Sequence, residues 1–444
     1  MKVQIQSKKF IKPSTPTPPS LRNYNLSFLD ELAPAFHVPF VLYYHAALGN
    51  STKTFSVLSS CNQLEKSLEL ILTRYYPLAG RYIKHNCSID CNDQGVQFVI
   101  AKVDTQLQGL LGLREAEELN HLIPPCEIGA VDEVSDPLLS IQLTIFACGG
   151  LAIGGCCPHM IADAFTLATF FSGWATACRE ESVDGICPSL NSASFFPRRG
   201  LDRLALGAAK TEMSADVSVT KMFTFNEKDI SRLRAIYHGR RVNPTGKSKP
   251  SSVQLVSAII WKALIGLDRA KHSPSRAYIA AQPVFLGGIT TLRIPHHTFG
   301  NLLGLATAHY KIGEGHNMDF RHLVDLLGGS VKKHVEDCEK LLSSGEDGYK
   351  IVIDPIVESN KNLSDSEVNF SLFTSWSKFP FYEVDFGWGK PVWATVVHTP
   401  VKNLVILMDD IKSGGIEAWV HLDKRDMPYF EQDCKGIDGV GVGG

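Results

Sequence analysis

The segment from residue 139 to 178 constrains the fold more tightly than any other part of this sequence. Apolar residues alternate with polar ones from 139 to 145, which predicts a half-buried strand. A glycine pair then turns the chain into a second apolar run, so we expect a β-hairpin. Apolar residues at helical spacing follow between 167 and 178. His159 stands at the join and can face a cleft there, although an ordinary polar role is the simpler reading for one histidine among 15.

The rest of the chain alternates between predicted strands and helices, which indicates a mixed α/β class. Strand-like runs occupy 40–44, 96–101, 219–225, 392–397, 404–408 and 415–422, and helical patterns occupy 64–74, 230–237, 253–267 and 320–342. A chain of 444 residues is too long for one hydrophobic core, so we expect two domains. Periodicity fades and Ser, Pro, Arg and Gly dominate in the middle of the chain. We therefore predict domains at 1–187 and 217–444, joined by a crossover loop at 188–216.

The composition is that of an ordinary globular protein, with 44% hydrophobic and 20% charged residues. A formal net charge of −2 and the lack of a long basic run argue against nucleic acid as a partner. The N-terminal segment is polar, and no apolar run is long enough to cross a bilayer, so we predict a cytoplasmic protein that binds no membrane. Eleven scattered cysteines favour neither a disulfide framework nor a zinc site.

Two short motifs carry the chemistry that the sequence suggests. His159 and Asp163 are spaced i,i+4 and could form a dyad on a continuous helix, whereas Asp163 would do structural work if the histidine precedes the helix. Residues 385–391 (DFGWGKP) predict a tight turn anchored by its aromatic side chains. The residues that define this second motif are Asp385, Gly387, Trp388 and Gly389.

Other short stretches match known motifs only incompletely. Residues 246–248 lack the earlier glycine of a phosphate-binding loop, and a kinase-like reading of 385–387 lacks its companion motifs. A Gly-x-Ser-x-Gly elbow does not occur in the sequence, so a serine hydrolase is not expected. Cys157 follows an apolar run, which favours a buried, inert thiol over a nucleophile.

The two motifs together resemble those of the plant BAHD acyl-CoA-dependent acyltransferases, and the resemblance covers essentially the whole chain. The supporting stretches are Tyr75 to Arg81, Phe299-Gly300-Asn301 and Thr374-Ser375-Trp376. Residues 13–18 and the segment from 408 to 419 are most similar to the alkaloid-acetylating branch. The resemblance implies two similar-sized domains, each a mixed β-sheet flanked by helices as in chloramphenicol acetyltransferase, with a channel between them.

The resemblance also implies roles for individual residues. His159 would be the general base on the acceptor hydroxyl, kept neutral near a helix N-terminus, and Asp163 would support its motif. Thr374 and Trp376 would donate hydrogen bonds to the oxyanion, while the turn at 385–389 would be a scaffold. Acyl-CoA, with acetyl-CoA expected, would be a co-substrate rather than a tightly bound cofactor. The acceptor would be a small-molecule alcohol, no metal is expected, and family members are usually monomers.

This sequence departs from the family pattern at two places. Family members carry Asn-Leu-Arg-x-Arg where this chain reads FLGGI at 285–289, and the first of those arginines pairs with the aspartate of the histidine motif. An unpaired buried carboxylate is costly, so either another cation, Arg293 or Arg276, replaces it beside Asp163 or Asp163 is hydrated or protonated, and we predict the relocated cation. Ser252 stands where relatives carry a basic residue near the CoA entrance. The CoA-binding candidates are therefore Lys247, Lys249, Ser251 and Ser252.

The leading hypothesis is transfer of an acetyl group to a hydroxyl of an alkaloid-like plant metabolite. A different donor, such as malonyl-CoA, or a phenolic acceptor is the second. The third is a protein of this fold that has lost acyl transfer and either binds small molecules or uses His159 as a base in another reaction. The missing arginines favour this last hypothesis, and His159, Thr374 and Trp376 count against it.

Overall fold

The computed structural model describes most of the chain. The described residues are 1–34, 36–46, 57–124, 136–201, 218–239, 249–272, 276–311, 318–341, 348–363, 365–399 and 401–436. Lys247 and most of the predicted crossover loop, from 202 to 216, lie outside these ranges.

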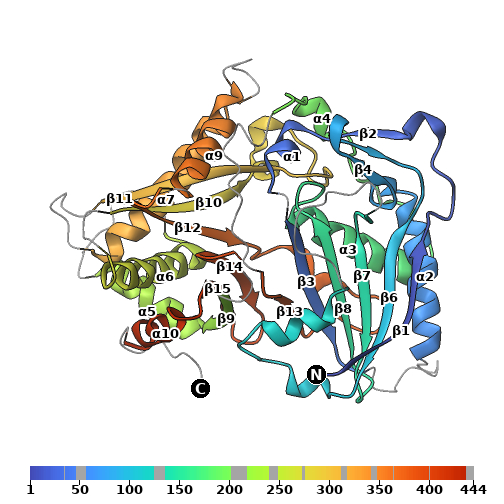
Figure 1. Cartoon of the computed structure of the whole chain (residues 1–444), viewed down its shortest axis with the longest axis horizontal. Coiled ribbons are helices and arrows are strands. Elements are labelled where there is room, and N and C mark those ends of the chain that lie inside the picture. The colour runs from blue at the N-terminus through green and yellow to red at the C-terminus, as the bar shows by residue number, and fades with distance from the viewer. Residues whose placement is uncertain are drawn as a thin grey trace.

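The first sheet carries the predicted hairpin near its centre (Figure 1). Its strands lie in the order β1–β6–β7–β8–β3–β13. Their bounds are β1 Val3–Ile11, β6 Val96–Val103, β7 Ser140–Ile145, β8 Leu151–Pro158, β3 His37–Tyr44 and β13 Trp393–Val396. β7 and β8 pair antiparallel, and Gly149 in the turn has a φ of +81°, so the hairpin prediction is confirmed. β6 and β7 are parallel, which makes the sheet mixed.

One strand of the first sheet comes from the far end of the sequence. β13 pairs antiparallel with β3, with Trp393 opposite Tyr43 and Val396 opposite Phe40. The rings of Tyr43 and Trp393 stack with centroids 5.2 Å apart. Membership of a sheet therefore does not follow position along the chain, and the boundaries at 187 and 217 stay a prediction.

The second sheet has the strand order β11–β10–β12–β14–β15–β9. The bounds are β11 Leu303–Lys311, β10 Ala277–Phe285, β12 Val368–Ser375, β14 Leu404–Asp410, β15 Gly415–Asp423 and β9 Ser218–Phe225. β12 runs parallel to both β10 and β14, and the other pairs are antiparallel. A small third sheet, β2 Asn23–Asn25, β5 Ser88–Asp90 and β4 Arg81–Ile83, lies beside the first.

Helices flank both large sheets, as the α/β prediction requires (Figure 1). In the first half, α2 (Val57–Leu72) packs on α3 (Ala164–Glu180). In the second half, α6 (Ser252–Arg269) packs on α7 (Phe320–Cys338), and both contact the sheet. The remaining helices are α1 Phe28–Leu32, α4 Ser192–Phe195, α5 Glu227–His238, α9 Lys350–Leu363 and α10 Met427–Gly436. None of the helices in the described part of the chain is long and apolar enough to span a membrane.

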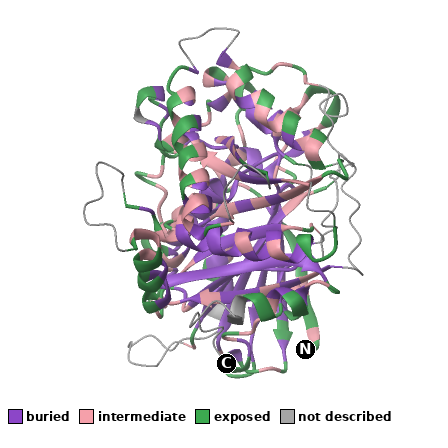
Figure 2. Ribbon diagram, turned by 90° about the vertical axis from the view of Figure 1, so that its left-hand side faces the viewer, coloured by how far each residue is buried: buried purple, intermediate pink, exposed green. Residues whose placement is uncertain are grey.

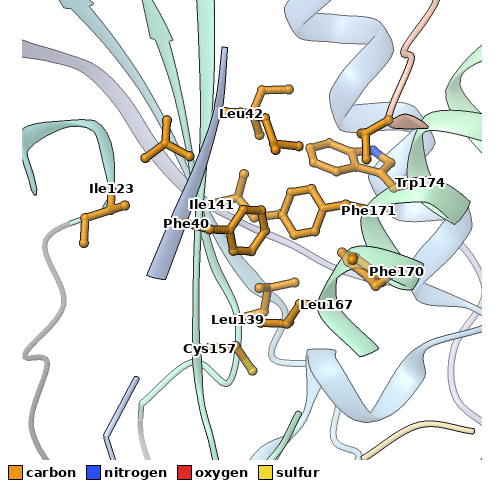
Figure 3. Packing of buried hydrophobic residues seen from close by; sticks show 14 of the residues in the cluster. Phe40, Leu42, Ile123, Leu139, Ile141, Cys157, Leu167, Phe170, Phe171 and Trp174 are labelled. Atoms are coloured by element: carbon orange, nitrogen blue, oxygen red, sulfur yellow. The ribbon is translucent and has the colours of Figure 1, made fainter. Parts of the chain in front are cut away.

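Buried residues are concentrated in the strands and on the helix faces that contact them (Figure 2). The core between the first sheet and α3 is aromatic: Phe40 on β3 meets Phe171 on α3 at 4.9 Å, and Phe171 meets Trp174 at 5.6 Å (Figure 3). These three side chains are each 1% exposed or less. Burial of such large apolar surfaces fixes α3, and with it the residues just before its N-terminus.

Candidate active site

His159 lies in the segment that connects β8 to α3, which we call the histidine turn (residues 159–163). β8 ends at Pro158, which pairs with His37 of β3. The backbone N–H of His159 donates to the carbonyl of Phe36 at 2.8 Å, so the turn is held against the strand next to it. The His159 side chain is half-buried. His159 therefore precedes the helix, and the continuous-helix dyad with Asp163 does not form.

Asp163 is the N-cap residue of α3. Its Oδ1 accepts a hydrogen bond from the backbone N–H of Thr166 at 2.8 Å, which satisfies one of the unpaired N–H groups of the first helical turn. Its Oδ2 accepts from the backbone N–H of Leu302 at 3.1 Å. The carboxylate thus connects the start of α3 to a segment of the other half of the chain. Both oxygens of Asp163 thus accept hydrogen bonds from backbone N–H groups.

The prediction of a relocated cation beside Asp163 is wrong. Arg276 pairs with Asp268 at 2.7 Å, and Arg293 is exposed. Within the described ranges, neither a lysine nor an arginine forms an ion pair with Asp163. Burial raises the pKa of Asp163, while the hydrogen bonds from Thr166 and Leu302 and the charge of His159 lower it. The partners of the Asp163 carboxylate are therefore the backbone N–H groups of Thr166 and Leu302.

Asn301 contacts His159, although it is not among the site residues predicted from the sequence. Its Oδ1 lies 3.0 Å from Nδ1 of His159, and its Nδ2 donates to the carbonyl oxygen of His159 at 2.7 Å. The same Nδ2 and the backbone N–H of Asn301 donate to Oδ1 of Asp30, at 2.9 and 2.7 Å. The only signal in the sequence was the stretch Phe299-Gly300-Asn301, which supports the family resemblance but reveals no partner.

Gly300 allows this close approach. Its φ is +117°, and a Cβ atom at this position would lie 3.2 Å from Oδ1 of Asp30. The carbonyl of Gly300 accepts from Oγ1 of Thr166 at 2.8 Å. The three residues 300–302 are therefore each bonded to the N-terminal half, through Thr166, Asp30 and Asp163. A side chain at 300 would combine an unfavourable φ with a crowded contact.

Thr374 and Trp376, the oxyanion candidates, lie at the end of β12 and just beyond it. Trp376 is 7% exposed, and its backbone N–H donates to Leu407 of the neighbouring β14 at 2.8 Å. Its ring lies 5.7 Å from that of Phe381, which in turn lies 5.0 Å from Phe40 on β3. Ring contacts thus connect Trp376 to the strand beside the histidine turn. Within the described part of the chain, no residue accepts a hydrogen bond from Oγ1 of Thr374 or Nε1 of Trp376.

Aromatic side chains gather on the same side of α3 as the histidine turn. Phe36 contacts the His159 ring edge-on at 5.8 Å. Phe165, in the first turn of α3, lies 4.5 Å from Phe285 and 5.3 Å from Phe379, which belong to the other half of the chain. One aromatic ring thus contacts His159 directly, and aromatic contacts of Phe165 connect the start of α3 to the other half of the chain.

The CoA candidates are only partly described. Lys247 lies outside the described residues, and Lys249 is exposed. Ser251 is the N-cap of α6, accepting from the backbone N–H of Gln254 at 3.1 Å, and Ser252 is the first residue of that helix. The N-terminus of a long helix favours anions because unpaired N–H groups point outward there. Assignment of these residues to CoA remains a proposal.

The second motif forms what we call the tryptophan loop (residues 385–389). Oδ1 of Asp385 accepts from the backbone N–H groups of Gly387 and Gly389 at 2.8 and 3.0 Å, and both glycines have positive φ, +106° and +109°. Phe386 is fully buried, 4.8 Å from Trp174, and its ring stacks on Trp388 at 5.4 Å.

The tryptophan loop is attached to the opposite end of α3 from the histidine turn. The Arg179 guanidinium donates to the carbonyl of Asp385. α3 spans roughly 24 Å from its N-cap to Arg179, at about 1.5 Å per residue. The structure therefore brings together His159, Asp163 and Asn301, and it places the tryptophan loop away from them.

Two other predictions concern groups near the site. Cys157 is fully buried, and burial raises the pKa of its thiol, as expected for an inert cysteine. In the described stretches, no cluster of three or more His, Cys, Asp or Glu side chains has the arrangement of a metal site.

Two mixed six-stranded sheets with flanking helices, and a histidine at the junction of a central hairpin and a helix, define a protein of the chloramphenicol acetyltransferase-like class. Comparison with protein families then identifies the particular group: the model of the Transferase family matches residues 1–436. The chain belongs to this family, the BAHD acyl-CoA-dependent acyltransferases. The family prediction and the fold prediction are both confirmed.

Individual relatives align over nearly their full length. The chain is 35% identical to pelargonidin 3-O-(6-caffeoylglucoside) 5-O-(6-O-malonylglucoside) 4'''-malonyltransferase from Salvia splendens, over 98% of this chain and 99% of that one. It is 34% identical to stemmadenine O-acetyltransferase from Catharanthus roseus, over 97% and 96%. The crystal structure of vinorine synthase superposes with a TM-score of 0.80 at 32% identity, covering 96% of each chain. The chain is thus an acyl-CoA-dependent O-acyltransferase, with acyl-CoA as co-substrate and a small molecule as acceptor.

Proposed function

We propose that this chain transfers an acetyl group from acetyl-CoA to a hydroxyl of an apolar, ring-containing acceptor of the alkaloid class, with His159 as the general base. The observation that carries the proposal is the placement of His159 in the histidine turn, with Nδ1 directed at Asn301 and the turn fixed by Asp163. A general base must be held in position, and the hydrogen bonds of the histidine turn do this.

The proposed reaction proceeds by direct transfer. Nε2 of His159 takes the proton of the acceptor hydroxyl while its oxygen attacks the thioester carbonyl carbon. The charge that develops on the carbonyl oxygen is stabilised by the Oγ1–H of Thr374 and the Nε1–H of Trp376, two donors that are fixed by their places in the second sheet. The C–S bond then breaks, and the CoA thiolate receives the proton from His159. Asp163 keeps the turn in place and exchanges no proton.

The acceptor class is supported by the aromatic surroundings of His159. Phe36 contacts its ring, and Phe165, in the first turn of α3, contacts Phe285, Phe379 and His296. Aromatic side chains of this kind bind flat, apolar ring systems well. The resemblance to stemmadenine O-acetyltransferase and vinorine synthase supports the same class.

A second candidate differs only in the donor. The similarity to a malonyltransferase of 35% identity over 98% of the chain favours malonyl-CoA as an alternative. Malonyl-CoA carries an extra carboxylate, which needs a cation or several hydrogen-bond donors near the thioester.

A donor-by-acceptor screen tests both candidates. Acetyl-CoA and malonyl-CoA are each incubated with hydroxylated alkaloids and with anthocyanin glucosides, and products are identified by mass spectrometry. We expect acetylated alkaloids, formed by the wild type and not by His159→Ala. Malonylated alkaloids as the main products would replace the proposal with the second candidate, malonylated glucosides would overturn the acceptor class as well, and product formed without CoA would contradict both. The proposed cytoplasmic, monomeric state is tested by cell fractionation and light scattering.

A further inference from the structure

A chain of three polar side chains, drawn from three separate parts of the sequence, ends on the ring of His159. Asp30 belongs to α1, Asn301 precedes β11, and His159 lies in the histidine turn. Asp30 Oδ1 accepts from Asn301 Nδ2 at 2.9 Å, and Asn301 Oδ1 lies 3.0 Å from His159 Nδ1. Both Asp30 and Asn301 are at most 1% exposed, so these contacts are shielded from water.

The orientation of the Asn301 amide follows from its partners. The nitrogen Nδ2 faces two acceptors, a carboxylate oxygen of Asp30 and the carbonyl oxygen of His159, at 2.9 and 2.7 Å. The reversed amide would bring its oxygen against both of these oxygens, which is repulsive. Oδ1 of Asn301 therefore faces the histidine ring. Because an amide oxygen only accepts, Nδ1 of His159 must carry a proton.

The ionised form of Asp30 suits this arrangement. Its Oδ1 accepts from the backbone N–H and the Nδ2 of Asn301, and its Oδ2 accepts from the backbone N–H and the hydroxyl of Ser27, at 2.8 and 2.7 Å. Burial raises the pKa of Asp30 to about 6, while these four hydrogen bonds oppose that rise. Above that pH the carboxylate accepts from four donors, and protonation would cost it one of them.

We propose that Asn301, oriented by Asp30, is a positioning residue that fixes His159 in the tautomer with the proton on Nδ1, so that Nε2 is the basic nitrogen. This inference rests on the proposed role of His159 as general base. The hydrogen bonds of Asp163 go to the backbone N–H groups of Thr166 and Leu302, whereas Asn301 contacts the His159 ring itself. When Nε2 takes a proton, the amide oxygen and the carboxylate behind it stabilise the imidazolium.

Nitrogen NMR on the whole chain tests the tautomer directly. Histidine is labelled with ¹⁵N, and His159 is assigned by the signals missing from His159→Ala. We expect a protonated Nδ1 and an unprotonated Nε2 in the wild type at neutral pH. Asn301→Leu keeps the backbone N–H to Asp30 but removes the amide. It should lose this tautomer preference and lower kcat by about 10²- to 10⁴-fold with KM unchanged.

A second, milder variant keeps the proposal testable if Asn301→Leu does not fold. Asp30→Asn presents one acceptor instead of two, so Asn301 loses the constraint on its orientation, and kcat should fall by about 10-fold or more. Asp229→Asn is the matched control. Asp229, like Asp30, is the third residue of a capping box, in α5, but among the described residues its side chain bonds to the cap residue Asn226 alone. It should leave the tautomer and kcat unchanged.

The outcomes separate the positioning role from the proposed function. A wild-type enzyme that is inactivated by His159→Ala but carries the His159 proton on Nε2 overturns the positioning role alone. The same holds if Asp30→Asn and Asn301→Leu fold normally and keep the wild-type kcat and tautomer. Full activity of His159→Ala overturns the proposed base and, with it, the inference.

Discussion

The histidine turn and the tryptophan loop are the two segments that mark the family, and they are built in opposite ways. At the histidine turn, polar atoms converge: Asp163, Asn301 and Asp30 exchange hydrogen bonds between the two halves of the chain. At the tryptophan loop, the hydrogen bonds of Asp385 Oδ1 are local to residues 385–389, one hydrogen bond from Arg179 reaches the carbonyl of Asp385, and the other long-range contacts are aromatic, from Phe386 to Trp174 and Tyr44. Both are attached to α3, one at each end.

The comparison shows how a single helix can serve two purposes. The apolar contacts of the tryptophan loop fix the C-terminal end of α3, where packing does not need exact atom placement. The N-terminal end must place one imidazole accurately, and directional hydrogen bonds do this better than apolar contacts. Variants at the histidine turn should therefore change catalysis, and variants at the tryptophan loop should change stability.

The largest effect is expected at His159. His159→Ala removes the proposed base and should lower kcat by about 10²- to 10⁴-fold, while the melting temperature stays within error of the wild type. Steady-state kinetics and thermal unfolding measure the two quantities. His309→Ala, an exposed histidine on β11, is the control and should change neither.

Phe386→Ala tests the other region. It deletes a fully buried ring at the tryptophan loop and should lower the free energy of unfolding by about 3–5 kcal/mol. The kcat of the folded fraction should stay near that of the wild type, because the loop is attached at the far end of α3. Chemical denaturation and active-site titration provide the comparison, with Leu363→Ala at an exposed position as control. A loss of kcat without a loss of stability would contradict the assignment of stability to the tryptophan loop and of catalysis to the histidine turn.

Thr374→Val and Trp376→Phe remove the proposed oxyanion donors while keeping side-chain shape. Each should lower kcat by up to about 10²- to 10³-fold, with little change in KM or stability. Thr224→Val on β9 serves as the matched control for the loss of a hydroxyl. If only one variant lowers kcat, that residue alone is the donor. If neither does, the oxyanion is stabilised by other groups.

Asp163→Asn should give the smallest and most mixed effect. Asparagine can accept from only one of the two backbone N–H groups of Thr166 and Leu302, so the free energy of unfolding should fall by about 1–3 kcal/mol. Loosening of residues 300–302 should also lower kcat. Asp319→Asn at the N-cap of α7 is the control, because in the described part of the chain that cap bonds to Arg321 alone and asparagine caps equally well. Equal effects of the two variants would show that Asp163 acts only as a helix cap.

Much of the fold could be predicted from apolar patterns, but not all of it. The hairpin and the helix after His159 were evident because their apolar residues recur at clear periods. β10, β11 and β12 were not predicted, because alanine and polar residues dilute the apolar signal in these strands. The pairing of β13 with β3 could not be predicted either, since local patterns carry no information about partners hundreds of residues away.

The candidate site could likewise be predicted only in part. Residue types and their spacing define the available chemistry: a histidine before a helix, an aspartate that can cap it, and the motifs that place the chain in its family. What replaces the missing arginine beside Asp163, and which amide contacts the His159 ring, depends on how the chain folds. The physical reason is that these partners are backbone N–H groups and buried polar atoms, which every sequence contains. They become specific only when folding removes water and brings residues 30, 159 and 301 within hydrogen-bonding distance.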